Sequence, residues 1–190
     1  MPDRPPLHID NRKDFLLLLL AAHGGQEDAE PVVGVTRLQK YLFLLQQEHD
    51  WNGRFHVSDP YEFEAYDYGP FDAQLYDDLV MLENAGLIDT SSAGPEPSAE
   101  NNESRRRDFD WATVDRELAP WESEDQIQRY ALTDRGRKFA SRYELSAEDE
   151  AVLADLKGTW NQRPLQALLR WLYHNYPEWA TNTRLPHLRA

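Results

Sequence analysis

Apolar residues recur every three or four positions in four long segments of the chain, the spacing that places them on one face of a helix. This pattern predicts helices over residues 11–22, 36–50, 72–85 and 164–176. The first segment is apolar nearly all round, so we expect it to lie at the centre of the core. The predicted buried stripes of the other three are Leu38, Tyr41, Leu42 and Leu45; Leu75, Leu79 and Leu82; and Leu165, Leu168, Leu169 and Leu172.

Polar residues at the start of several segments predict how the helices begin. A side-chain oxygen just before a helix can accept hydrogen bonds from the free backbone N–H groups of its first turn. The expected caps are Asp10 for the first helix, Thr36 with Gln39 as a capping box for the second, Thr133 for a helix to about residue 143, and Ser146 with Asp149 as a capping box for residues 147–158.

A pair of short strands is predicted after the third helix. Gly86 supplies the left-handed conformation that ends this helix, and Leu87 and Ile88 then start a strand. Residues 129–132 return as a second strand that leads into the helix capped by Thr133. This order is typical of a winged helix-turn-helix. We therefore expect a mainly α (α+β) fold, a winged helix-turn-helix-like domain with a two-stranded wing and extra N- and C-terminal helices.

Two further segments are not helical in pattern. Residues 55–68 alternate in places, with Phe63 and Ala65 on one side and Glu62 on the other, which predicts an extended segment that Gly69-Pro70 breaks. Residues 91–125 combine prolines with a Ser/Asn/Glu tract and lack apolar periodicity. We expect this tract to be a flexible insertion at the wing, within a single domain that spans residues 1–190.

Composition narrows the possible functions. The chain has no cysteine, which excludes disulfides, thiolate metal sites and cysteine nucleophiles. Its longest apolar run, residues 15–22, is far shorter than the roughly 20 residues of a membrane span, so we expect a cytoplasmic protein without membrane contact. The net charge of −14 repels phosphate at long range, so any nucleic-acid contact would need a local basic face.

The third helix and the turn before it form the first candidate site. We expect exposed carboxylates on this helix, at Asp72, Asp77, Asp78 and Glu83, and it contains no lysine or arginine. Base and phosphate contacts are dominated by cationic and amide donors, so the helix favours a basic protein partner or a solvated acidic face over DNA. The aromatic turn before it is either an exposed anchor for a partner or part of the core. The candidate protein-binding residues are Tyr66, Tyr68, Pro70, Phe71, Asp77 and Asp78.

Basic residues form the second candidate site. Arg135, Arg137 and Lys138 lie on the helix after the wing, and Arg105, Arg106 and Arg107 are adjacent in the insertion. Both groups are candidates for nucleic-acid binding, although pairing with the acidic body accounts for the first and a solvated charge run for the second.

A catalytic function would depend on one further group of residues. His56, Asp59, Glu62 and Glu64 lie within nine residues and have the side chains that bind a hard divalent metal. No partner histidine follows at ligand spacing, so solvated loop charge is the favoured interpretation and a metal-dependent hydrolase the alternative. The chain has no nucleophile elbow, phosphate loop, dinucleotide fingerprint or zinc-protease helix, and we expect no cofactor or metal.

Several sequence blocks resemble known families. Residues 36–45 (TRLQKYLFLL), residues 63–71 (FEAYDYGPF) and Leu75-Tyr76 are similar to the Panacea antitoxin-domain family, which includes phage- and mobile-element-associated proteins. The chain is more similar to a neighbouring, largely uncharacterised bacterial winged-helix-like family. In that family the same helix and Tyr-Gly-Pro turn precede Asp77-Asp78-Leu79, Leu87-Ile88 and a Tyr-x-Leu-Thr-x-x-Gly return. The matching blocks span residues 15–88, 129–140 and 165–177, and Tyr176-Pro177 near the C-terminus is similar to both families.

The resemblance implies a small α-rich scaffold that works by binding. Panacea domains are implied to neutralise unrelated toxins by protein contact, and related members act as adaptors or lie beside defence genes. Neither family implies a shared catalytic residue. We therefore expect a non-catalytic protein-binding module of antitoxin, adaptor or defence-associated type whose partner is a toxin or a defence-system component. The alternative is a winged-helix DNA-binding transcriptional regulator.

Overall fold

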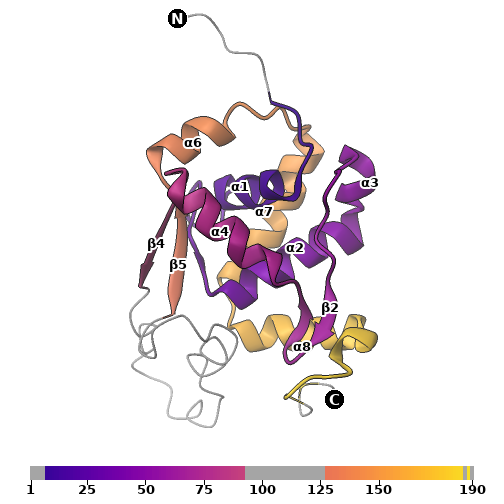
Figure 1. Cartoon of the computed structure of the whole chain (residues 1–190). Helices are drawn as coiled ribbons and strands as arrows, with labels where there is room; N and C mark the ends of the chain where they lie inside the picture. The colour runs from indigo at the N-terminus through magenta and orange to yellow at the C-terminus, as the bar shows by residue number, and fades with distance from the viewer. Residues whose placement is uncertain (1–6, 93–126, 186–187, 189–190) are drawn as a thin grey trace, which may run out of the picture.

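The chain folds as a mixed α+β structure built mainly from helices (Figure 1). The computed structural model describes residues 7–92, 127–185 and 188, so all but the first two residues of the predicted insertion lie outside the described residues. The elements are α1 Arg12–Ala21, β1 Val32–Val33, α2 Val35–His49, α3 Trp51–Phe55, β2 Glu64–Tyr66, β3 Gly69–Phe71, α4 Gln74–Asn84, β4 Ile88–Ser92, β5 Gln128–Leu132, α6 Asp134–Ala140, α7 Ala147–Asn161, α8 Leu165–Asn175 and the 3-10 helix η2 Pro177–Ala180.

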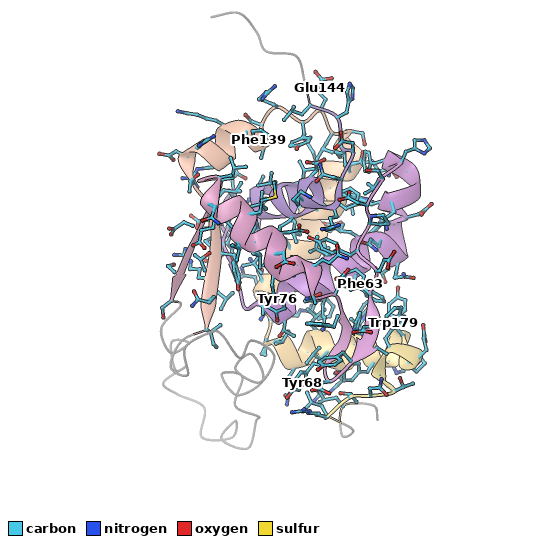
Figure 2. All side chains as sticks on the ribbon, viewed as in Figure 1. Phe63, Tyr68, Tyr76, Phe139, Glu144 and Trp179 are labelled. Carbon is cyan, nitrogen blue, oxygen red and sulfur yellow. The ribbon has the colours of Figure 1, made fainter. Side chains whose placement is uncertain are left out.

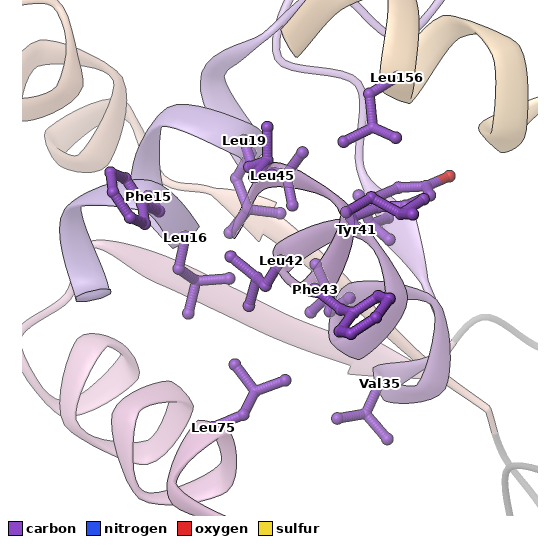
Figure 3. Close-up of a cluster of buried hydrophobic side chains, with 14 of the residues drawn as sticks. Phe15, Leu16, Leu19, Val35, Tyr41, Leu42, Phe43, Leu45, Leu75 and Leu156 are labelled. Atoms are coloured by element: carbon purple, nitrogen blue, oxygen red, sulfur yellow. The ribbon is translucent and has the colours of Figure 1, made fainter. Parts of the chain in front are cut away.

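Helices α1 and α2 form the centre of the core. All five leucines of α1 are buried, and so is every residue of α2 from Val35 to Leu45. Figure 3 shows Leu16 of α1, Leu42 of α2 and Leu75 of α4 converging in one cluster. The burial of α1 confirms the central position predicted for residues 11–22. Both helices are buried because other elements cover them from several sides.

The predicted stripes of the later helices are also buried. Leu75, Leu79 and Leu82 of α4 face the core, as do the four leucines predicted in α8. The interiors of these helices therefore follow the spacing of their leucines, since removing such side chains from water is the main favourable term in folding.

Two of the predicted caps are wrong. Asn11 caps α1 in place of Asp10, because its side chain accepts from the Lys13 N–H while Asp14 completes the capping box. Helix α2 begins at Val35 after Gly34, so Thr36 lies inside the first turn. Gln39 is consequently free to bond another segment. The predicted caps Thr133 and Ser146 are confirmed, and each accepts a backbone N–H of its helix.

The segment between α2 and α4 differs from its predicted form. Asp50 adopts a left-handed conformation, with φ 46°, so the chain turns and continues as the short helix α3. Buried Trp51 then packs edge-on against Phe15, with ring centroids 5.3 Å apart. Gly69-Pro70 does not end the extended segment. It belongs to β3, which pairs antiparallel with β2 so that Ala65 faces Pro70.

The predicted two-stranded pair after α4 is confirmed, and it has a third strand. β4 and β5 pair antiparallel, with Ile88 opposite Leu132, and β1 pairs with the other edge of β5. The strand order is β1-β5-β4. Gly86 has the left-handed φ of 68° that was predicted for the end of α4.

Helix α6 is fixed to the start of this sheet by Thr133. The Thr133 hydroxyl donates to the Gly86 carbonyl at 2.7 Å and accepts the Gly136 N–H at 3.0 Å. A Cβ on Gly136 would lie 1.9 Å from the Leu87 carbonyl oxygen. Glycine is therefore required there by the close approach of α6 to the chain that enters β4.

Candidate functional site

Cationic side chains are missing from one continuous part of the chain. Residues 57–92, which carry the β2–β3 hairpin, α4 and β4, contain nine acidic residues and no lysine, arginine or histidine. In Figure 1, α4 runs across the front of the molecule between the β4–β5 pair and β2. The face that contains α4 therefore carries negative charge from its own residues.

Four of these acidic residues serve the fold. Asp78 accepts from Arg12 Nε at 2.6 Å and from the Tyr61 hydroxyl at 3.0 Å, and this contact raises the pKa of the Arg12 guanidinium above its ordinary value. Asp59 pairs with the same arginine, and Asp67 pairs with Arg184. The fourth is Asp72.

The predicted exposure of Asp72 and Asp78 is wrong, because both side chains are buried. Asp72 accepts the backbone N–H groups of Glu62, at 2.7 Å, and Gln74, at 2.8 Å. Its own backbone bonds the side chain of Gln39. A carboxylate that accepts several N–H bonds can remain buried, and these bonds tie α2, the hairpin and the start of α4 together.

The other five carboxylates are exposed. Glu62, Glu64, Asp77, Glu83 and Asp89 have no cationic partner among the residues that the structure describes. Asp77 and Glu83 lie on the outer side of α4. Their exposure agrees with the sequence prediction for these two residues.

Exposed hydrophobic side chains lie on the same part of the chain. Among the large hydrophobic side chains of the described residues, three are exposed: Tyr66 by 44%, Val80 by 57% and Met81 by 57%. Val80 and Met81 follow Asp77 at i+3 and i+4, so the three are neighbours on the helix surface. Exposed apolar groups gathered in this way are typical of interaction sites.

A run of aromatic rings connects the hairpin to α4. The Tyr66 ring stacks on Phe71, with centroids 5.0 Å apart, and Phe71 lies 6.1 Å from Tyr76. Tyr76, labelled near the lower end of α4 in Figure 2, lies one turn before Val80. We call this surface the α4 face. It comprises Tyr66, Phe71, Tyr76, Val80 and Met81, flanked by Glu64, Asp77 and Glu83.

The α4 face continues into a groove beside the β4–β5 pair. The groove has a volume of about 340 Å³ and lies between α4 and the β4–β5 pair. Tyr76, Leu79, Val80 and Glu83 line its helix side, and Thr90, Gln128 and Tyr130 its sheet side. Its walls are therefore mostly apolar and include one carboxylate, that of Glu83.

The predicted aromatic anchor divides into buried and exposed members. Tyr68 is 3% exposed and lies at the end of the hairpin near α8 (Figure 2). Pro70 is also buried, and its carbonyl accepts from the buried Lys40 ammonium at 2.9 Å. Tyr68 and Pro70 consequently belong to the core, whereas Tyr66 and Phe71 reach the surface.

Sequence reasoning missed Tyr76, Val80 and Met81. Their signal was present, because Val80 and Met81 are apolar residues that do not fit the Leu75, Leu79 and Leu82 stripe. Apolar residues outside a predicted core stripe mark the other side of a helix.

The predicted basic residues lie elsewhere. Arg135, Arg137 and Lys138 are exposed on α6, where Arg137 pairs with Asp134 at 2.8 Å. This contact lowers the pKa of the Asp134 carboxyl below its ordinary value. Arg105, Arg106 and Arg107 lie outside the described residues.

The candidate metal ligands are not brought together. Asp59 pairs with Arg12, and His56 ends α3 in a left-handed conformation. Glu62 and Glu64 are exposed on the hairpin segment. Within residues 7–92 and 127–185, no group of three or more histidine, aspartate or glutamate side chains has an arrangement that could hold a metal ion.

Comparison of the chain with protein-family models, curated proteins and solved structures finds no match. In the part of the chain that the structure describes, no helix has the length and apolar character needed to cross a membrane.

Proposed function

We propose that this protein is a non-catalytic, cytoplasmic binding module that engages a protein partner through the α4 face. The observation that carries the proposal is the composition of α4, which exposes Val80 and Met81 beside Asp77 and Glu83 and has no lysine or arginine. An apolar centre with charged groups at its edge is the usual anatomy of a protein interface. The setting that we propose is that of an antitoxin, an adaptor or a defence-associated protein.

We also propose that the fold is a winged helix. The order α1, β1, α2, α4, β4, β5 and the sheet order β1-β5-β4 support this assignment. In such an arrangement α4 takes the place of the helix that reads bases in DNA-binding members. Its carboxylates would face phosphate groups there, which supports a protein partner over the major groove.

A photo-crosslinking amino acid in place of Met81 tests the proposal in host cells. We expect a specific adduct with one protein, and none from the same group at the exposed Asp155 of α7. The captured partner, purified and mixed with this protein, should bind Met81→Ser roughly tenfold more weakly than the wild type, as expected for a contact at an interface centre. No adduct from position 81, or equal affinity of the two proteins, would contradict the proposal.

A DNA-binding regulator is the second candidate function. The wing topology and the exposed Arg135, Arg137 and Lys138 of α6 favour it. Under our proposal, affinity for duplex DNA at physiological salt stays in the non-specific range of roughly 10⁻⁴ to 10⁻⁶ M. Tight, sequence-selective binding that Arg135→Ala and Lys138→Ala abolish would establish the regulator instead.

A further inference from the structure

The charge of the α4 face restricts its possible partners. Asp77 and Glu83 flank Val80 on α4, and no cation of the described residues pairs with either carboxylate. Two copies of this face would bring like charges together, and a nucleic acid would bring phosphates to the same carboxylates. Both arrangements are disfavoured by repulsion between like charges. The complementary surface is cationic.

The apolar part of the face restricts the partner further. A polycation without apolar groups would leave Val80 and Met81, each 57% exposed, in water. The groove beside them is bounded by Tyr76 on α4 and Tyr130 on β5, so it has room for an apolar side chain between two aromatic walls. An occupant that covers both features needs apolar and cationic side chains on adjacent sides.

The position of the groove favours a helical occupant. An added strand would bond the outer edge of β4, which is the last strand in the sheet order of the described residues. The groove is lined instead by side chains from the face of the sheet, at Thr90, Gln128 and Tyr130, and from α4. Side-chain recognition without backbone pairing is the mode in which an amphipathic helix lays its apolar face into a groove.

We propose that the occupant of the α4 face is a cationic amphipathic helix of another protein. Its apolar residues lie in the groove against Tyr76 and Val80, and its lysines or arginines pair with Asp77 and Glu83. This inference rests on the proposed function and names the chemistry of the partner.

Binding of synthetic peptides tests the inference directly. The probe is a fluorescein-labelled leucine/lysine peptide of about 18 residues, long enough to be helical when bound. A lysine/serine peptide of equal charge and a leucine/glutamate peptide of equal apolarity are the comparison probes. Fluorescence anisotropy gives the Kd at low and at physiological salt, and amide NMR shifts locate the bound peptide.

Two double variants separate the contribution of apolar contact from that of charge. We expect Val80→Ser/Met81→Ser to weaken leucine/lysine binding by roughly tenfold or more, as for an interface centre. Asp77→Asn/Glu83→Gln should weaken it several-fold and reduce its salt dependence. The matched control is Glu150→Gln/Asp155→Asn on α7, which removes the same two charges from another exposed surface. It should bind like the wild type, and melting curves should be similar for all proteins.

Other outcomes overturn the inference. Equal binding of the lysine/serine peptide, or equal weakening by the α7 control, would show attraction to net charge alone. Preference for the leucine/glutamate peptide, displacement of the probe by duplex DNA, or self-association that Val80→Ser/Met81→Ser abolishes would each assign the face another occupant. A partner cross-linked at position 81 through a non-cationic segment would overturn this inference and leave the proposed function standing. The absence of any adduct would reject the proposed function itself.

Discussion

Asp77 and Asp78 are adjacent in the sequence and have opposite roles. On α4 the side chain of Asp77 is exposed and that of Asp78 is buried. Asp78 accepts two hydrogen bonds from Arg12 and one from Tyr61. Charge reversal of both residues would therefore disturb the fold as well as the α4 face. A test of binding has to change Asp77 and leave Asp78 in place.

Asp78→Asn should cost about 1.5–3 kcal/mol of unfolding free energy, because the partly buried Arg12 guanidinium loses its shortest charged hydrogen bond and keeps only Asp59 as a counter-charge. Asp77→Asn has the same chemistry on the exposed side of the helix and should change stability by less than about 0.5 kcal/mol. Urea unfolding of the two variants measures both values. Similar values for the two would mean that the Arg12–Asp78 pair does not hold α1 against α4.

The buried Lys157 side chain should make the stability of the protein depend on pH. Its ammonium is wholly buried and donates to the carbonyls of Leu20 and Ala22 at 2.9 Å, at the end of α1. Burial lowers the pKa of Lys157 from 10.5 to about 7, partly offset by Glu30 and Glu27. Between these two pKa values the unfolded chain binds more protons at this site, so its contribution to stability rises with pH.

Lys157→Met removes this titration. The stability of the wild type relative to Lys157→Met should be lowest below pH 7 and should rise as the pH increases toward 10, because the cost of the buried charge disappears. Thermal unfolding of both proteins across this range gives the difference. A difference that is independent of pH would show that the Lys157 amine keeps its charge throughout.

The pattern of the sequence did not predict the buried cations. Lys40, Lys157 and Arg37 are all buried, and each donates to backbone carbonyls of a segment far away in the sequence. Nothing near them in the sequence marks these acceptors, because the carbonyls become available only when the helices pack. Leucine stripes were predictable since their burial depends on spacing within one helix.

At the scale of elements, Gly136 fixes the junction between α4, the sheet and α6. Gly136→Ala should destabilise the protein by at least about 1–3 kcal/mol, the usual cost of forcing atoms into a packed site, because the new Cβ meets a backbone oxygen. Gly158 in α7 is the control, since its added Cβ would make ordinary contacts of 3.6 Å or more. Gly158→Ala should be neutral or stabilising by up to about 1 kcal/mol. Chemical denaturation compares the two, and an equal effect would contradict the steric account.

The elements that the sequence predicted correctly are those with local signals. The end of α4 at Gly86, the β4–β5 pair and the start of α6 at Thr133 are specified by residues within each turn. The two residues of β1, the helix α3 and the pairing of β3 have no such signal. They form because neighbouring elements supply their partners, so a pattern within the segment could not reveal them.

At the scale of the whole molecule, the C-terminal residues support the hairpin of the candidate site. The Arg184 N–H donates to the Asp67 carbonyl at 2.8 Å, and Asn182 donates to the Ala65 carbonyl at 2.8 Å. Leu185 and Leu188 are buried in the core cluster. The α4 face, which lies in the first half of the sequence, therefore depends on the last residues of the chain.

Removal of residues 181–190 should lower the unfolding free energy by roughly 3 kcal/mol or more, since two leucines lose their burial. Hydrogen exchange should become faster over residues 64–71 while α7 stays protected. Arg184→Ala is the matched control, because an exposed ion pair contributes only about 0–1 kcal/mol. Unchanged exchange in the hairpin after truncation would contradict this dependence.

The sheet order has a consequence for how the chain is made. β5 lies between β1 and β4, so β1 has no strand to pair with until residues 128–132 have been synthesised. Helices α1 and α2 leave the ribosome long before that point, with leucines that the finished sheet and the later helices α7 and α8 cover. Translation adds about 5–20 residues per second, so these helices remain incompletely covered for several seconds. During that interval the nascent chain should be a substrate for chaperones that bind exposed leucine-rich segments.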